Sequence, residues 1–177
     1  MTIQETRKEL LSKRESLSAQ QIKEASLRMA DDLLKDPHFQ ESDTIYVYWP
    51  VHNELDTNYL VTKAIQLGKT VAFPVVLSKG DMVFEQIDDP IRFHENRYRI
   101  MEPVYDPKAV IDRPGLMIVP IVGFCGNKRI GYGSQYYNNY LKWRKNVYTI
   151  GVAYSFQELS ELAEDERDIP LDEIRTY

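Results

Sequence analysis

The N-terminal forty residues carry apolar side chains at helical spacing. Four of them lie three or four positions apart and share one face: Ile22, Ala25, Met29 and Leu33. This spacing predicts an amphipathic helix that begins after a capping box at Ser18 and ends before Pro37. The preceding segment, 5–17, is charged with few apolar points, and we expect it to form a surface helix.

The next part of the chain alternates between β-rich runs and one helical pattern. Residues 44–49 and 70–73 are the β-rich runs, and a proline directly follows each. We expect each proline to stop its strand. Between the runs lies a helical pattern that Gly68 ends, since glycine favours the position after a helix C-terminus. Strand, helix and strand in this order predict a right-handed crossover between parallel strands.

The second half of the chain contains further strand and helix patterns. Residues 116–119 and 147–153 are continuous apolar runs, typical of strands covered on both faces. Residues 82–87 predict another strand, and residues 136–145 predict a helix. Residues 88–113 hold several prolines and charges and predict a long loop with little regular structure.

Composition agrees with an ordinary globular protein. The chain has 177 residues, of which 43% are hydrophobic and 28% charged, and these values exclude disordered and low-complexity classes. The net charge of −5 argues against a general nucleic-acid or membrane-surface binder. We therefore expect one domain over residues 1–177, of α/β class with a mostly parallel sheet.

The cysteine content and the N-terminal sequence restrict the class of protein and its expected cellular location. The single cysteine, Cys125, excludes an intramolecular disulfide and a cysteine-based zinc site. Its role is that of a small structural residue or of a nucleophile, and the first is the simpler interpretation. The N-terminus is charged from the start, and no run approaches the roughly 18 apolar residues that span a bilayer. We expect a cytoplasmic protein.

The segment 128–137 is the part of the sequence that points most clearly to chemistry. Gly131 and Gly133 permit positive φ and close approach of a ligand, while Lys128 and Arg129 add charge before a predicted helix. This pattern suits a phosphate cradle at the carboxyl end of a parallel strand. Gly-x-Gly also occurs in plain tight turns, so both interpretations stay open.

A second candidate is Glu54, which follows Trp49 on a loop at a predicted strand end. A carboxylate there can accept hydrogen bonds from the N–H groups of a flat heterocycle, although a solvated loop glutamate is the simpler alternative. The three histidines, His38, His52 and His94, lack metal-ligand spacing, and we expect them at the surface. The acidic run 161–168 is mostly a solvated face, of which one member could bind Mg²⁺.

These residues, taken in order, resemble one known family. Blocks similar to its motifs occur at 48–50, 54–57, 68–74, 82–84, 101–103, 118–120, 129–133, 136–137 and 168–174. The chain resembles the 5-formyltetrahydrofolate cyclo-ligase family, also called methenyltetrahydrofolate synthetase. The resemblance implies a three-layer α/β/α fold of the NagB/RpiA/CoA-transferase kind. It also implies an ATP- and Mg²⁺-dependent enzyme that phosphorylates the formyl oxygen of 5-formyltetrahydrofolate and closes the ring to 5,10-methenyltetrahydrofolate.

The same resemblance implies roles for individual residues. Contacts to ATP fall to Arg7, Arg129, Gly131, Tyr132, Gly133, Ser134, Gln135 and Tyr137. The folate site falls to Trp49, Glu54, Tyr132 and Tyr136, with Glu54 on the pterin edge. Catalysis falls to Arg129 and Tyr136, and Mg²⁺ to Asn138 and Asp168. The implied partner is a reduced folate, with or without a polyglutamate tail, and the protein is expected to be a monomer or weak dimer.

Several positions depart from the family pattern. Asn138 stands where the family has an aspartate that binds Mg²⁺, Ile3 replaces a phosphate-binding lysine, and Ser134-Gln135 replaces small loop residues. These changes lie on the ATP and Mg²⁺ side, while the Glu54 block is kept. The alternative is therefore a catalytically impaired relative that binds a reduced folate or a nucleotide without turnover. A further alternative is another nucleotide-binding or phosphoryl-transfer role on the same fold.

Overall fold

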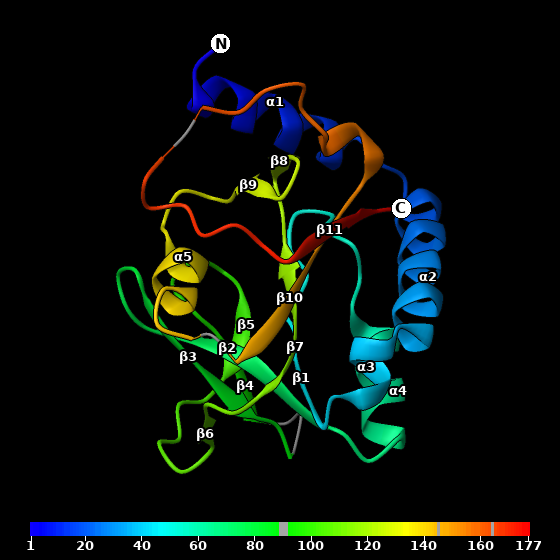
Figure 1. The fold of residues 1–177 in the computed structure, drawn as a ribbon, viewed down its shortest axis with the longest axis vertical. Helices are drawn as coiled ribbons and strands as arrows, with labels where there is room; N and C mark the ends of the chain where they lie inside the picture. Colours follow the sequence, from blue (N-terminus) through cyan, green and yellow to red (C-terminus); the bar gives the residue numbers. More distant parts are fainter. Residues whose placement is uncertain (89–91, 145, 164) are drawn as a thin grey trace.

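The fold is built around a mixed β-sheet (Figure 1). A computed structural model describes residues 1–177 except 89–91, 145 and 164. Within these residues the sheet has seven strands in the order β11-β10-β7-β1-β2-β3-β6. The strands are β1 (Thr44–Tyr46), β2 (Thr70–Ser78), β3 (Asp81–Gln86), β6 (Val110–Ile111), β7 (Gly115–Pro120), β10 (Val147–Ala153) and β11 (Glu173–Thr176). Strands β11, β10, β7, β1 and β2 run parallel, whereas β3 and β6 are antiparallel to their neighbours.

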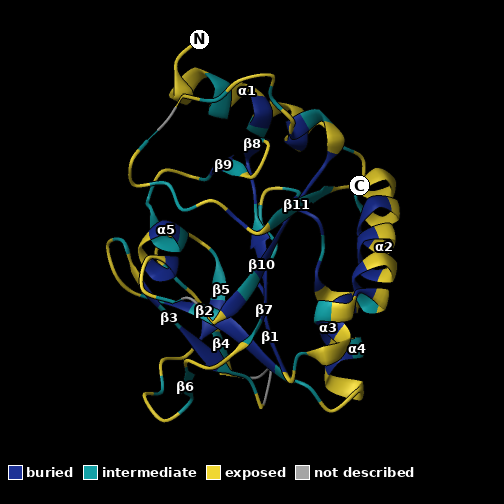
Figure 2. Ribbon diagram, viewed as in Figure 1, coloured by how far each residue is buried: buried dark blue, intermediate teal, exposed yellow. Residues whose placement is uncertain are grey.

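Helices cover both faces of this sheet. They are α1 (Ile3–Glu15), α2 (Ala19–Lys35), α3 (Pro37–Glu41), α4 (Asn58–Gln66) and α5 (Tyr136–Leu141), with the short 3₁₀ helix η2 (Ser155–Gln157). Figure 1 shows α2, α3 and α4 together on one side, α5 on the other, and α1 across one end. Each face has its own apolar cluster, and Figure 2 shows the sheet as the buried centre. The predicted α/β class with helices on both faces and a mostly parallel sheet is confirmed.

The α2 helix forms as its sequence predicts. Ser18 accepts a hydrogen bond from the Gln21 amide, and the Gln21 side chain accepts one from the Ser18 amide. Met29 and Leu33 on the predicted face are fully buried against the sheet. Burying each such side chain contributes about 1.5–3 kcal/mol. The capping box therefore sets where the helix begins, and its apolar face sets how it packs.

The predicted crossover is also present. Strands β1 and β2 pair in parallel with Thr44 beside Thr70, and α4 connects them. Gly68 ends the connection at φ +75°, a conformation that glycine adopts without strain. The first strand is shorter than the predicted 44–49, because its ladder with β2 ends at Tyr46.

The prediction that Pro74 stops its strand is wrong. Strand β2 continues through Pro74 to Ser78, and Pro74 pairs with Phe84 of β3. Strand β1 pairs with β2 only as far as Ala72. Pro74 therefore lies where β2 has lost that neighbour, and proline is tolerated on such an edge.

The prediction of a structureless segment 88–113 is wrong for its described part. Strands β4 (Phe93–Glu95) and β5 (Met101–Pro103) form a hairpin, and β6 joins the main sheet. The hairpin is anchored by the buried Glu102, whose Oε2 accepts hydrogen bonds from the Val76 amide and the Asn96 side chain. The charged, proline-rich sequence of this segment does not indicate strands. They are stabilised by contacts to residues far along the chain, such as the bond from the Val76 amide of β2 to Glu102 of β5. Residues 89–91 of this prediction lie outside the described residues.

Three other strands were not predicted, and one helix is shorter than predicted. Strands β8 (Gly123–Cys125) and β9 (Lys128–Ile130) form a hairpin before the glycine-containing segment, and β11 adds the C-terminal segment to the sheet. Helix α5 ends at Leu141, and Lys145, the predicted end, lies outside the described residues, as does Glu164 of the acidic run. Every helix in the described part of the chain falls short of the length and apolar character that membrane crossing needs.

Candidate active site

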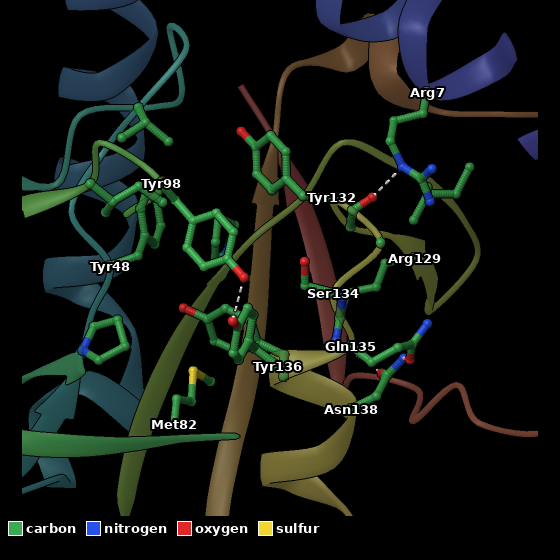
Figure 3. Close-up of a pocket in the computed structure, with 18 of the residues that line it drawn as sticks. Arg7, Tyr48, Met82, Tyr98, Arg129, Tyr132, Ser134, Gln135, Tyr136 and Asn138 are labelled. Atoms are coloured by element: carbon green, nitrogen blue, oxygen red, sulfur yellow. Dashed lines mark hydrogen bonds between the residues drawn. The ribbon is translucent and has the colours of Figure 1, made fainter. Parts of the chain in front are cut away.

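A cavity of about 560 Å³ opens at the carboxyl ends of β1, β2 and β7. Its walls are completed by helix α1, the β4–β5 hairpin, the segment 129–138, and the residues Leu162, Ala163, Asp165, Arg167 and Asp168 that precede β11. Figure 3 shows side chains from these separate elements converging on one space. Ligands bind at this edge in open parallel sheets, as the sequence predicted for 128–137. The cavity brings together segments more than 100 residues apart along the chain.

One group of residues, here called the carboxylate end, consists of Glu54 and Tyr132, which line the cavity, and of Arg14, which donates to the Tyr132 hydroxyl. Glu54 is 5% exposed. Its Oε2 accepts a hydrogen bond from the Val51 amide at 2.9 Å, and its Oε1 accepts one from the Tyr132 hydroxyl at 2.8 Å. Burial raises the pKa of Glu54, and the charge of Arg14 acts in the opposite direction. Glu54 is therefore a buried, oriented carboxylate, not the solvated loop residue of the simpler interpretation.

Arg14 is the largest fully buried side chain of the described residues. Its Nε donates to the His52 carbonyl at 2.7 Å, its Nη1 to the Ile121 carbonyl at 3.1 Å, and its Nη2 to the Tyr132 hydroxyl. Nη2 also lies 4.0 Å from Glu54 Oε1. Sequence reasoning did not single out Arg14 as a site residue. Its spacing of four from the buried Leu10 placed it on the inward face of α1, and that was the available signal.

Trp49 lines the cavity, with two further aromatic rings packed against it. Trp49, a predicted folate-site residue, is half-buried and packs against Phe73 and Phe93, with ring centroids 6.3 and 5.5 Å apart. Phe93 comes from β4 and was not anticipated. Flat, apolar walls of this kind suit a planar ligand.

A second group of lining residues, here called the arginine end, consists of Arg7, Arg129, Gly131, Gly133 and Asn138. The Arg7 Nε donates to the Gly131 carbonyl at 2.7 Å, which fixes the predicted N-terminal arginine beside the loop. Gly133 has φ +101°, as predicted, and a Cβ there would lie 3.6 Å from the Arg7 guanidinium. Gly131 does not have a positive φ; a Cβ there would come within 3.3 Å of Arg129 Nη1. The backbone conformation therefore does not require a glycine at position 131, and a side chain there would crowd the Arg129 guanidinium.

Arg129 is the buried cation of the arginine end, at 8% exposure. Its Nη2 donates to Asn138 Oδ1 at 3.0 Å, whereas its Nε has no hydrogen-bond partner among the described residues. Burial lowers the pKa of this guanidinium, and the charges of Tyr137 and Asp168 oppose that effect. A buried, incompletely bonded arginine favours an anionic ligand, because an anion would satisfy both its charge and its remaining N–H groups.

Asn138 and Asp168, the predicted Mg²⁺ ligands, contact each other directly. Asn138 Nδ2 donates to Asp168 Oδ1 at 2.9 Å and to Gln135 Oε1 at 2.6 Å. Asn138 Oδ1 accepts from Arg129 Nη2 and from the Ile169 amide, at 3.0 and 3.2 Å. Arg129 offers only donors, so it fixes which amide atom faces it. All hydrogen-bonding positions of this amide are taken, and the pair as arranged does not fit a metal ion bound by both side chains.

The last loop residues before α5 and the first residues of α5 also line the cavity. Ser134 lines the cavity, and Gln135, the residue before α5, has φ +59°. The ring of Tyr137, on α5, lies 5.7 Å from the Arg129 guanidinium. Burial raises the pKa of Tyr137. The structure thus brings all predicted site residues to one cavity.

Tyr98 and Arg97, at the tip of the β4–β5 hairpin, were missed. The hydroxyls of Tyr98 and Tyr136 share a hydrogen bond of 2.8 Å across the cavity, as Figure 3 shows, and Arg97 Nη2 donates to both. These bonds lower the pKa of Tyr98. No local sequence pattern marks Tyr98 as a site residue, because its hydrogen-bond partner, Tyr136, lies 38 positions away in the chain.

The remaining candidates lie apart from this chemistry or at its margin. His38 stacks on Tyr148, His94 lies beside Glu102, and His52 is exposed at the cavity edge. Cys125 is a half-buried free cysteine on β8. Within the described residues, no three or more histidine, cysteine, aspartate or glutamate side chains are grouped so that they could hold a metal ion.

Comparison with known proteins gives a consistent result. A model of the 5-formyltetrahydrofolate cyclo-ligase family matches residues 2–177. The 5-formyltetrahydrofolate cyclo-ligase of Escherichia coli K12 is 29% identical over 171 residues, covering 93% of this chain and 94% of the relative. That of Mycoplasma pneumoniae is 30% identical over 132 residues, covering 73% and 70%.

Solved structures agree with the sequence relatives. The chain is similar to the NMR structure of Aquifex aeolicus 5,10-methenyltetrahydrofolate synthetase, with a TM-score of 0.83 and 31% identity over 99% of this chain and 90% of that one. It is also similar to the 5,10-methenyltetrahydrofolate synthetase of Mycoplasma pneumoniae, with a TM-score of 0.75 and 26% identity over 98% of each chain. The chain belongs to the 5-formyltetrahydrofolate cyclo-ligase family.

Proposed function

We propose that residues 1–177 act as one domain that converts 5-formyltetrahydrofolate to 5,10-methenyltetrahydrofolate, with ATP converted to ADP and phosphate. The γ-phosphoryl group moves from ATP to the formyl oxygen and ADP leaves. N10 of the folate then attacks the formyl carbon and loses its proton, and the C–O bond breaks with departure of phosphate. Phosphorylation is needed because a formamide oxygen is a poor leaving group.

The observation that carries this proposal is the polarity of one cavity. The cavity is lined both by a buried carboxylate, Glu54, and by a buried arginine, Arg129, whose Nε has no hydrogen-bond partner among the described residues. A reduced folate offers N–H donors on its pterin ring, and ATP offers an anionic triphosphate. The two ends therefore suit the two substrates, and the cavity between them suits the transfer.

At the arginine end, Arg7 and Arg129 neutralise the phosphates of ATP, and 131–137 surround the nucleotide and the reacting end of the folate. Arginine can bind phosphate oxygens in a bidentate manner. The hydroxyl of Tyr136, which is hydrogen-bonded to that of Tyr98, contacts the transferring group in this proposal. These residues supply positioning and charge neutralisation, which account for most catalysis in phosphoryl transfer.

At the carboxylate end, Glu54 accepts hydrogen bonds from the pterin, and Trp49 packs on its face. The ionised carboxylate has two oxygens, which match two neighbouring N–H donors on a flat heterocycle. Tyr132 belongs to the same site, and its hydroxyl donates to Glu54 Oε1. Magnesium would neutralise phosphate charge as a partner of ATP, and no step here depends on an ion held by Asn138 and Asp168.

The alternative is a relative that binds folate or nucleotide without turnover. It is favoured by the closed hydrogen-bond arrangement of Asn138, which offers no free oxygen to a metal. It predicts binding of the same ligands with no product. We also expect a monomer or weak dimer with no nucleic-acid or membrane partner.

Near-ultraviolet absorbance on mixing protein, 5-formyltetrahydrofolate, ATP and Mg²⁺ tests the proposal. The methenyl product has a conjugated chromophore that the substrate lacks, so a rise that needs both ATP and protein establishes turnover. A flat trace, beside a family member of proven activity as control, contradicts it. Calorimetry with each ligand separately then decides whether the binding-only alternative holds.

A further inference from the structure

The carboxylate end contains an arginine that no substrate needs to touch. Arg14 is 1% exposed, and its guanidinium donates to two carbonyls and to the Tyr132 hydroxyl. These contacts hold it 4.0 Å from Glu54 Oε1. Arg14 of α1 is thus fixed beside a carboxylate that lines the cavity, without lining the cavity itself.

Burial alone would leave Glu54 in the wrong state for its proposed work. A carboxyl group taken out of water favours its neutral form, and burial is the largest effect on the pKa of Glu54. A neutral carboxyl has one oxygen that donates, so it cannot accept two N–H bonds from a pterin edge. Something must keep this group ionised if it is to bind the ring.

Arg14 is the cation that acts on Glu54 among the described residues. The other titratable groups that face the carboxylate are tyrosines: Tyr48 after β1, Tyr132 before α5, Tyr137 on α5 and Tyr154 after β10. Burial raises the pKa of each of them, and that of Tyr154 to about 12. They are neutral at physiological pH, so they cannot balance the charge of Glu54.

Tyr132 has a second part in this arrangement. Its hydroxyl accepts from Arg14 Nη2 and donates to Glu54 Oε1, which is the oxygen nearest to Arg14. The Val51 amide already occupies Oε2. A ligand that binds both oxygens must therefore replace the Tyr132 bond, or share that oxygen with it.

We propose that Arg14 is a positioning residue of the folate site, which keeps Glu54 ionised and holds the Tyr132 hydroxyl as the donor that a pterin N–H displaces. This inference rests on the proposed function, in which Glu54 binds the pterin. It adds a residue of α1 to the folate site, although the same helix also supplies Arg7 to the arginine end. One helix thus serves both ends of the cavity.

The test is the affinity for 5-formyltetrahydrofolate, measured by calorimetry without ATP between pH 5 and 8.5. Variants are Arg14→Met, Arg14→Lys, Glu54→Gln and Tyr132→Phe, each checked for its thermal midpoint and its ATP affinity. The wild type should lose affinity as the pH falls and Glu54 takes up a proton. A unit charge at this distance changes an acid dissociation constant by tenfold or more at the effective dielectric of a protein.

The expected pattern separates charge from structure. Arg14→Met should move the acidic midpoint of binding upward by about one unit or more, with affinity recovering at pH 8.5. Arg14→Lys should keep the midpoint within about half a unit of the wild type, since it retains the charge. Glu54→Gln should bind weakly with no such midpoint. Tyr132→Phe should bind about threefold to tenfold more tightly at pH 8.5, since a net hydrogen bond no longer has to be displaced.

Other results overturn the proposal. Identical midpoints for the wild type and Arg14→Met would show that Arg14 only supports the fold, and the proposed function would still stand because the wild type binds folate. No folate binding by the wild type at any pH rejects the proposed function itself. If Arg14→Met does not fold, Tyr132→Phe decides, because it alters no backbone contact: unchanged or weaker affinity at pH 8.5 means that the hydroxyl is not displaced.

Discussion

The two ends of the cavity differ in how their polar groups are satisfied. At the carboxylate end, each oxygen of Glu54 and each nitrogen of Arg14 has a protein partner. At the arginine end, Arg129 is nearly as buried but keeps an unpartnered Nε. A satisfied site is pre-organised and its ligand must exchange bonds, whereas an unsatisfied site gains bonds when a ligand arrives. The comparison predicts that a ligand exchanges hydrogen bonds with protein groups at the carboxylate end. At the arginine end, it predicts that an anionic ligand neutralises the charge of Arg129.

The largest effect should come from removing the unsatisfied cation. Arg129→Met should lower kcat/KM for ATP by about 10²–10³, as loss of one electrostatic contact in a reaction site does. Its thermal midpoint should stay equal or rise, because the substitution removes a buried charge whose Nε has no hydrogen-bond partner among the described residues. Steady-state kinetics and thermal unfolding measure both.

Arg144→Met is the matched control for that variant. Arg144 also has an Nε without a hydrogen-bond partner, but it lies outside the cavity beside Asp112. It should leave both KM values within about twofold. Equal losses in the two variants would mean that Arg129 acts on the fold and not on ATP.

At the carboxylate end, Glu54→Gln should weaken folate binding by about 100-fold and leave ATP binding unchanged. Each hydrogen bond to a charged group contributes about 1.5–3 kcal/mol. Glu85→Gln, a change at another buried glutamate outside the cavity, is the control. Isothermal titration with each ligand measures the effect, and parallel loss of both affinities would point to unfolding.

Glu54 should also give a measurable pH dependence of stability. Its folded-state pKa is raised, so the folded protein holds this proton more tightly than the unfolded chain does. The wild type should therefore lose stability relative to Glu54→Gln as the pH rises from below 4.5 through the raised pKa. Denaturant unfolding at several pH values checks the sign, and a wild type that gains stability relative to Glu54→Gln as the pH rises would contradict it.

Asn138→Asp sharpens the comparison at the arginine end. The variant loses the donor that Gln135 and Asp168 accept, and it places two carboxylates side by side. We expect a loss of about 1–3 kcal/mol of stability without divalent cations, and partial recovery in millimolar Mg²⁺. The exposed neighbour change Asn139→Asp is the control, and an equal response to Mg²⁺ in both would exclude a new site.

The smallest expected effect concerns the bond that crosses the cavity. Tyr98→Phe removes the hydroxyl that pairs with Tyr136, and one exposed hydrogen bond contributes about 0.5–1 kcal/mol. KM for folate should therefore change about twofold to fivefold. Tyr105→Phe, at another exposed tyrosine, should change nothing. Equal KM values for folate in Tyr98→Phe and Tyr105→Phe would mean that the tip of the β4–β5 hairpin does not contribute to folate binding.

Local pattern was sufficient for the elements that local sequence stabilises. The capping box at Ser18, the spacing of Met29 and Leu33, and the glycine at 68 each predicted a helix boundary or face that the structure contains. Strand β2 did not follow its local rule at Pro74, because the effect of a proline depends on which neighbour the strand has at that residue. Neighbours across a sheet are not visible in a single sequence.

The site was predictable in its members but not in its contacts. Glu54, Arg129 and the two glycines stood out by residue type and context, and the family resemblance joined them. The bond between Glu54 and Tyr132 spans 78 positions, and that between Arg14 and Tyr132 spans 118. Such pairs depend on tertiary packing. Helical spacing could place Arg14 on the inward face of α1, but no local pattern gave its partners, and none marked Tyr98.

The C-terminal strand gives this cavity an order of assembly. Asp168 and the Ile169 amide hold Asn138, Arg175 of β11 is bonded to Asp32 and Asp36 near the end of α2, and the Tyr177 hydroxyl donates to Asp32. Synthesis runs from the N-terminus, so these contacts form after most of the sheet can exist. A nascent chain can thus complete its carboxylate end before its arginine end, and nucleotide binding should be acquired last.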